Sequence, residues 1–330
     1  MKASVLLPFR DVSRWLDEAI RSVREEACVG RIVLVDDGST DASSEIAARH
    51  AHEDARVEIV RTAGLGIVRA LEIGRTRCQS EYIARMDGDD VSLRGRIERQ
   101  IEALDRDQTL AVLGTQVEAF PSPDEGLTRY VDWQNALLSP IDHAHALFIE
   151  SPLCHPSVTM RASAVETVGG YREGDFPEDY DLWLRLAAQG FSLAKVDAHL
   201  FRWRHRESRL TFTDARCSRA AFRRLKARHL AARLIHEGGF AIWGAGTTGR
   251  RLAGALREHG AWPSAFIDID PRKIGNTKLG GAQVHAPTLL DSLPRPFIVV
   301  AVGARGAREV IRPQLHARGL VEGRDFLCAS

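Results

Sequence analysis

Two strand-like runs in the first third of the chain each end abruptly in carboxylates. Residues 33–35 lead into one pair of acids and residues 83–86 into a group of three: Asp36, Asp37, Asp87, Asp89 and Asp90. Such runs are typical of buried parallel strands, and an open α/β sheet binds ligands beyond the carboxyl ends of its strands. Carboxylates gathered together repel one another unless a cation joins them, and hard divalent ions are usually held by carboxylates and substrate phosphates. The sequence therefore predicts a site for a divalent metal ion and a phosphorylated ligand.

The elements around these acids alternate between strand and helix patterns. Strand patterns cover residues 4–7, 31–35, 57–60 and 82–86, with helical patterns between them. This rhythm predicts a mostly parallel sheet with right-handed crossovers. Further along we expect a helix that Asp90 caps and that runs to about residue 104, a strand over 111–117, a loop over 121–140, a strand over 156–160, and a helix over 178–189 that Gly190 ends.

The composition is that of an ordinary globular protein. The 330 residues, 44% of them hydrophobic and 27% charged, are enough for two domains. The formal net charge of +1 gives no overall field that would attract nucleic acid. The five cysteines are scattered and odd in number, and the sequence shows neither a signal peptide nor an apolar run long enough for a membrane span. We therefore expect a cytoplasmic protein.

Residues 213–238 form a long basic helical pattern. Its arginines would suit a surface of anionic lipid, but they also interrupt its apolar stripe. We expect a linker helix between two domains, and peripheral contact with the inner face of the membrane is the alternative.

A second α/β unit covers residues 239–330. A strand over 240–243 runs into Gly244, Gly246 and Gly249, a helix follows, and Asp268 stands further on. This is the dinucleotide-binding pattern, in which glycines let a phosphate approach a helix N-terminus. The segment is about half of a full dinucleotide-binding domain and resembles the small Rossmann-like domains found beside sugar-modifying enzymes. A ligand-binding loop and a docking or structural role are the two hypotheses for it.

Six short motifs follow one another over residues 3 to about 210. They are Leu6-Leu7-Pro8, Val35-Asp36-Asp37-Gly38-Ser39-Thr40-Asp41, Met86-Asp87-Gly88-Asp89-Asp90, His155-Pro156-Ser157-Val158, Gly169-Gly170-Tyr171 and Glu178-Asp179-Tyr180-Asp181-Leu182-Trp183-Leu184-Arg185. Any one of them is weak, but all six in this order resemble the family 2 glycosyltransferases. The resemblance implies a Rossmann-like GT-A domain over residues 1–212, and a nucleotide-diphosphate sugar, most often with uridine, as the donor.

The resemblance also implies which residues bind the donor. Asp37 would accept a hydrogen bond from the base, Asp87 would face the ribose, and Asp89 would hold Mn²⁺ or Mg²⁺ on the diphosphate. Pro8 lies in the first motif, and Arg69 would be a phosphate contact where nearby positions depart from the family pattern. The simpler alternatives are that Asp37 caps the following helix and that the acidic turn is an ordinary surface turn.

The remaining residues concern the sugar and the acceptor. Asp179 would be the catalytic base that takes the proton of the acceptor hydroxyl. Glu178, His155 and Trp183 would lie near the donor sugar or the acceptor, and His205 would reach the metal or the diphosphate. Because acids are favoured at a helix N-terminus, a capping role for Glu178 and Asp179 is the alternative.

Together these features predict an inverting, metal-dependent glycosyltransferase that moves a sugar from a nucleotide donor, usually a UDP-sugar, to a glycan or glycolipid hydroxyl. Two other functions compete with this one. A sugar-1-phosphate nucleotidyltransferase has a related sheet, but residues 8–11 lack the glycine-rich loop of that class. A nucleotide-sensing or scaffold protein would instead use the C-terminal unit.

Overall fold

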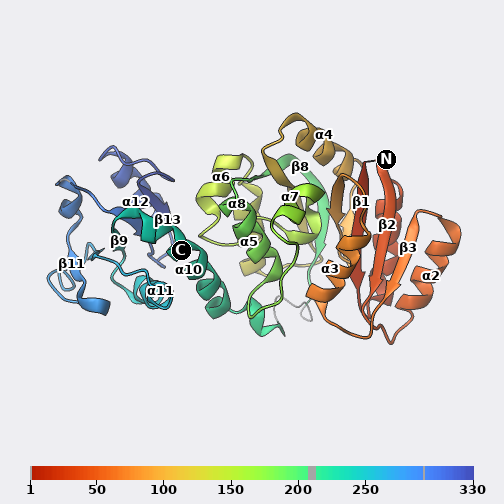
Figure 1. Ribbon diagram of the computed structural model, residues 1–330, viewed down its shortest axis with the longest axis horizontal. Coiled ribbons are helices and arrows are strands. Elements are labelled where there is room, and N and C mark those ends of the chain that lie inside the picture. Colours follow the sequence, from red (N-terminus) through yellow and green to blue (C-terminus); the bar gives the residue numbers. More distant parts are fainter. Residues whose placement is uncertain (1, 207–212, 293) are drawn as a thin grey trace. The chain divides into compact units, whose positions relative to one another are not determined.

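The computed structural model describes residues 2–206, 213–292 and 294–330, which divide into two compact units (Figure 1). Unit 1 comprises Met1–His143 and Pro152–Asp214, and unit 2 comprises Ala144–Ser151 and Ala215–Ser330. The domain boundary expected at residue 212 lies outside the described residues.

One mixed sheet forms the centre of unit 1. Among the described residues it has eight strands in the order β3-β2-β1-β4-β7-β6-β8-β5. Their bounds are β1 Ala3–Phe9, β2 Val29–Asp36, β3 Val57–Arg61, β4 Tyr82–Arg85, β5 Val91–Ser92, β6 Leu110–Phe120, β7 Thr159–Arg161 and β8 Ser192–Arg204. The first four strands pair in parallel as predicted, whereas β7 runs antiparallel to both β4 and β6.

The helices of unit 1 pack on both faces of this sheet (Figure 1). They are α1 Ser13–Arg24, α2 Ser43–Glu53, α3 Ile67–Arg77, α4 Arg96–Arg106, α5 Glu125–Asn135, α7 Ala162–Thr167 and α8 Glu178–Ala188. Helix α6 Pro140–Ala146 contains the division between the two units. The apolar residues of α1 and α4 join the buried faces of β1 and β2 in one core. Helix α8 ends where expected, with Gly190 at φ 84° just after it.

Two expectations for this region are wrong. Helix α5 occupies the segment expected to be a loop, because the Asp124 side chain caps its N-terminus by accepting the Leu127 N–H at 2.7 Å. Asp90 does not cap α4, since β5 intervenes and the helix begins after Gly95, which has a φ of 80°.

Unit 2 contains a parallel sheet in the order β11-β10-β9-β12-β13. The strands are β9 Phe240–Trp243, β10 Ala265–Ile267, β11 Gln283–His285, β12 Phe297–Val300 and β13 Phe326–Cys328. This is the 3-2-1-4-5 strand order of a Rossmann-like fold. The helices are α10 Arg219–Leu234, α11 Thr247–Arg257 and α12 Ala307–His316.

Helix α10 lies within the basic segment expected to be a linker. It buries Ala227, Leu230, Ala231 and Leu234 in the same core as β9 and β12. Its apolar side is therefore covered by unit 2, and its outer side carries the exposed arginines Arg219, Arg224 and Arg228. Among the described residues no helix has the length and apolarity that crossing a membrane would require.

Candidate active site

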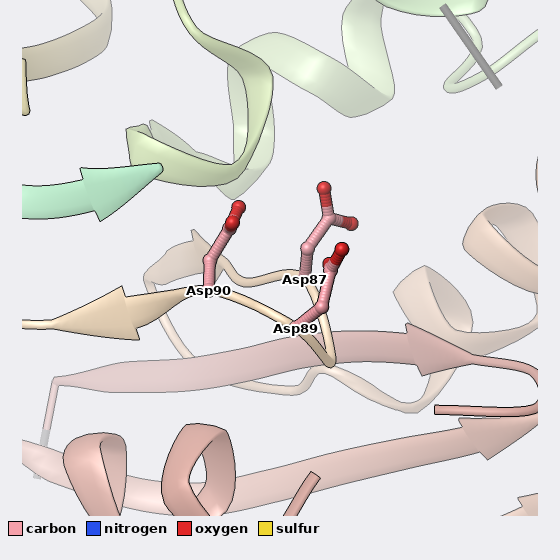
Figure 2. A group of neighbouring side chains, drawn as sticks. All are labelled: Asp87, Asp89 and Asp90. Atoms are coloured by element: carbon pink, nitrogen blue, oxygen red, sulfur yellow. The ribbon is translucent and has the colours of Figure 1, made fainter. Parts of the chain in front are cut away.

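The acidic turn between β4 and β5 gathers three carboxylates. Each of Asp87, Asp89 and Asp90 offers an oxygen that lies within 4.8 Å of the others'. Figure 2 shows the three side chains pointing to the same side of the turn, away from β1 and β2. Carboxylate oxygens are the ligands that Mg²⁺ and Mn²⁺ favour, so the donor set fits a hard divalent cation.

Hydrogen-bond donors already contact all three acids, and two of these donors are guanidinium groups. The buried Arg85 donates from Nη2 to Asp87 Oδ1 at 2.7 Å, and Arg206 donates from Nε to Asp89 Oδ2 at 2.6 Å. The backbone N–H of Arg204 donates to Asp90 Oδ1 at 2.7 Å. The arginine on the almost fully buried Asp89 carboxylate shows that this position attracts a positive charge.

Asp37 holds the loop that follows β3. Its Oδ1 accepts hydrogen bonds from the Thr62 hydroxyl at 2.5 Å and the Leu65 N–H at 2.7 Å, and its Oδ2 accepts the Gly66 N–H at 2.8 Å. The N-cap of α2 is Ala42, so Asp37 does not cap that helix. Contact between Asp37 and a nucleotide base stays a prediction. The second acceptor position of Oδ2, beside the bond from Gly66, suits such a contact.

Glu178 and Asp179 open α8, after Pro177 at the N-cap. Asp179 Oδ1 accepts the N–H of Tyr180 at 2.7 Å. Burial, and next the neighbouring charge of Glu178, raise the pKa of Asp179 to about 7, while the charge of Arg85 acts in the opposite direction. A carboxyl group with a pKa near neutrality is suited to general base catalysis at physiological pH.

An aromatic cluster lies beside these acids. His155 Nε2 and the Tyr171 hydroxyl are 2.8 Å apart, and the ring of Trp183 meets the His155 ring edge-on with centroids 5.8 Å apart. Burial, and then the charge of Arg85, hold the pKa of His155 well below its usual value, so this imidazole is neutral. Trp183 is fully buried, which places its ring behind His155 as packing.

The other predicted donor residues occupy different surroundings. Pro8 is buried within β1, and Arg69 is exposed and forms an ion pair with Glu173 at 3.2 Å. The backbone N–H of His205 donates to the Phe120 carbonyl at 2.6 Å. The next residue, Arg206, is the one that contacts Asp89.

Buried polar residues beneath the site were not predicted. Arg96 donates to the carbonyls of Arg85 at 3.2 Å and Pro156 at 3.0 Å, and the Gln100 amide donates to the Ser157 carbonyl at 2.8 Å. These bonds from α4 tie the end of β4 to the segment that carries His155. Of these residues, Arg85 alone could have been singled out from the sequence. It is a charged residue in an otherwise apolar strand run, and buried charges are uncommon.

The glycine loop of unit 2 lies between β9 and α11. A Cβ on Gly249 would come within 1.8 Å of the Gly244 carbonyl oxygen, whereas Gly246, the N-cap of α11, faces open space. Asp268 Oδ2 accepts the Ala245 N–H at 2.9 Å and contacts Lys273 Nζ at 3.0 Å. Asp268 thus braces the loop, and ligand binding there stays a prediction.

Comparison with known proteins agrees with this arrangement. The profile of glycosyl transferase family 2 matches residues 4–169. The putative glycosyltransferase EpsE of Bacillus subtilis is 31% identical over 62% of this chain and 73% of its own length. An Escherichia coli UDP-Gal:alpha-D-GlcNAc-diphosphoundecaprenol beta-1,3-galactosyltransferase is 26% identical over 57% of this chain and 69% of its own.

Solved structures share the fold at low sequence identity. Staphylococcus aureus TarS in complex with UDP-GlcNAc superposes with a TM-score of 0.57 at 15% identity, covering 78% of this chain and 72% of that one. The Pyrobaculum calidifontis mannosyltransferase PcManGT in complex with GDP-Man and Mn²⁺ gives a TM-score of 0.51 at 16% identity, covering 78% and 75%. Fold and acidic turn together define a glycosyltransferase of GT-A fold. Within that class, the chain belongs to glycosyl transferase family 2.

Proposed function

We propose that this protein is an inverting, metal-dependent glycosyltransferase that moves a sugar from a nucleotide-diphosphate donor, in the first instance a UDP-sugar, to a hydroxyl of a glycan or lipid-linked glycan. The observation that carries the proposal is the meeting of two acidic segments far apart in the sequence. The buried guanidinium of Arg85 bonds Asp87 directly and interacts electrostatically with Glu178 and Asp179.

The acidic turn would serve the donor. Asp89 would hold Mn²⁺ or Mg²⁺, and such an ion, when bound, neutralises the negative charge that develops on the departing nucleoside diphosphate. Asp87 would face the ribose, while Asp37 would bind the base from the loop that it already holds. Arg206 must give up its bond to Asp89 before a cation takes that oxygen, so its charge becomes available to the diphosphate.

Asp179 would serve the acceptor. Its carboxylate takes the proton from an acceptor hydroxyl as that oxygen attacks the anomeric carbon and the bond to the diphosphate breaks. A single displacement of this kind inverts the configuration at the anomeric carbon. Glu178 and the neutral His155 would border the sugar, with Trp183 fixing the imidazole from behind.

The relatives support the choice of substrates. Of the two solved structures, one is a complex with UDP-GlcNAc and the other a complex with GDP-Man, and the E. coli relative is named for a diphosphoundecaprenol-linked acceptor. An acceptor of that class would be presented at the inner face of the membrane, so we expect a cytoplasmic enzyme there. The exposed arginines of α10 suit anionic headgroups. Membership of a transferase family favours this function over a nucleotidyltransferase or a sensor.

The experiment that tests the function is transfer from a panel of UDP- and GDP-sugars with Mn²⁺ to lipid-linked and free glycan acceptors. For the donor that is used, Asp179→Asn should lower the transfer rate by about 10²–10⁴-fold, the usual contribution of a general base. Donor binding measured by calorimetry should be unchanged. Transfer at the wild-type rate by this variant would contradict the role of Asp179, and a product with retained configuration would contradict the single displacement.

A further inference from the structure

Arg85 lies at the centre of the site, at the end of β4. Its residue surface is 2% exposed, and its backbone N–H donates to the Val158 carbonyl at 2.8 Å. Nη2 donates to Asp87 Oδ1 at 2.7 Å, and Nη1 donates to the carbonyl of Met86. Its Nε–H has no hydrogen-bond partner among the residues that the structure describes. The guanidinium therefore engages only one carboxylate oxygen directly.

This bonding differs from that of a buried arginine with a purely structural task. Arg161, on β7, donates to the carbonyls of Leu104 at 2.7 Å and Leu110 at 3.3 Å and to the Tyr82 hydroxyl at 3.4 Å, and its Nη1 lies 3.9 Å from a Glu81 oxygen. An arginine that only neutralises one carboxylate commonly forms two parallel hydrogen bonds with it. Arg85 forms a single hydrogen bond with Asp87 and one with a backbone carbonyl, and its charge also acts on other groups around it.

Those groups belong to the second acidic segment. The charges of Arg85 and Glu178 interact, and Arg85 counteracts the burial and the Glu178 charge that raise the pKa of Asp179. Arg85 likewise opposes the burial that raises the pKa of Tyr171, and it helps to keep His155 neutral. Charge interactions are stronger in a buried site than in water, so a single cation here can influence both acidic segments.

We propose that Arg85 is a positioning residue for both halves of the reaction, fixing Asp87 for the donor and stabilising by its charge the carboxylate of the base Asp179. The inference rests on the proposed function. It explains why a charged side chain interrupts the apolar strand that leads to the acidic turn.

The test compares Arg85→Gln with Arg85→Lys. Glutamine removes the charge, so the pH at which kcat/KM reaches half its maximum should rise by about 1 unit, the lower end of the shift that a close opposite charge produces. Lysine keeps the positive charge on a shorter side chain, so the pH profile should stay near that of the wild type. The donor KM should rise, because Asp87 loses the hydrogen bond from the guanidinium.

Arg161→Gln is the matched control, since it removes a buried arginine from the same sheet. It should lower the thermal stability and leave the pH profile unmoved. An Arg85→Gln profile that coincides with the wild-type one would overturn the proposal. If Arg85→Gln does not fold, Arg85→Lys decides: a rate lowered equally at all pH values with an unchanged donor KM would contradict it.

A second measurement needs no turnover. Titration of ¹³Cγ-labelled aspartate by NMR, with Asp179→Asn to assign the signal, should show Asp179 protonating at a higher pH in Arg85→Gln than in the wild type. An Asp179 signal that titrates at the same pH in both proteins would contradict the inference. A moved signal in a protein that transfers no sugar would reject the proposed function while confirming that Arg85 stabilises the Asp179 carboxylate.

Discussion

At the scale of single residues, the environment of each carboxylate separates its role from that of its neighbours. Asp87 and Asp89 each meet an arginine, whereas Asp179 is set beside Glu178 in a largely desolvated position. Positive neighbours favour a carboxylate that stays ionised, and burial beside another acid favours one that can take up a proton. These environments support the proposal that the same residue type serves for cation binding in one segment and for proton transfer in the other.

The pKa of Asp179 sets a pH dependence for the reaction. Because a base must be unprotonated to act and the pKa of this carboxyl is raised to about 7, kcat/KM should rise with pH through about that value and then level off. Rates measured from pH 5.5 to 8.5 with saturating Mg²⁺ check this expectation. A rate already at its plateau at pH 5.5 would mean that Asp179 titrates normally or is not the base.

Arg206 should compete with the metal. Its guanidinium occupies an oxygen of Asp89 at 2.6 Å, so Arg206→Gln should bind Mn²⁺ several-fold more tightly in the absence of donor. Calorimetric titration with Mn²⁺ alone measures this. Arg202→Gln, on the preceding strand β8 and paired with Glu118 at 3.4 Å, serves as the control and should bind Mn²⁺ as the wild type does. Weaker binding by Arg206→Gln would contradict the competition.

At the scale of elements, α8 is anchored by residues of its own motif. Arg185 forms an ion pair with Asp181 at 2.7 Å and donates to the carbonyls of Val168 at 2.7 Å and Gly170 at 2.8 Å. Gly170 has a φ of 66°, and a Cβ there would meet a Glu72 oxygen at 2.4 Å. These bonds join the glycine pair to α8 and fix the helix whose N-terminus carries Asp179.

In unit 2, the packing of α11 on β9 depends on one glycine. A Cβ on Gly249 would lie 1.8 Å from the Gly244 carbonyl oxygen, so Gly249→Ala should destabilise unit 2 by about 1–3 kcal/mol through overpacking. Gly254→Ala, on the same helix with no atom within 4 Å of the added Cβ, should instead stabilise it by about 0.5–1 kcal/mol. Thermal unfolding followed by circular dichroism separates the two, and equal effects would refute the packing argument.

At the scale of the whole molecule, the chain carries two units with separate cores. The family match, over residues 4–169, lies in unit 1 except for Ala144–Ser151. The acidic turn and Asp179, to which the proposed reaction is assigned, lie in unit 1 as well. Unit 2 keeps the Rossmann-like strand order with a glycine loop braced by Asp268.

The two units should respond differently to the donor nucleotide. We expect UDP with Mn²⁺ to raise the unfolding temperature of unit 1 alone, by the equivalent of about 2.7 kcal/mol at a ligand concentration of 100 times Kd. Differential scanning calorimetry should resolve two transitions, and Gly249→Ala would identify the one that belongs to unit 2. A shift of the unit 2 transition would instead place a nucleotide site at its glycine loop.

Much of this fold is encoded locally. The parallel start of the sheet, the acidic turn and α8 were predictable because strand ends, helix stops and short motifs are properties of adjacent residues. Helix α5 was missed because Gly126 and the neighbouring prolines obscure a helix that Asp124 caps. The antiparallel insertion of β7 was missed because strand direction depends on partners distant in the sequence.

The family, the acids of the turn and the candidate base could be predicted from the sequence, since each is written in a short motif. The groups that these acids face became visible in the fold. Arg85 bonds Asp87 and acts by its charge on Asp179, Arg206 contacts Asp89, and the buried Trp183 packs against His155. No local pattern encodes such contacts, because charge interactions and burial depend on distances between segments far apart in the sequence.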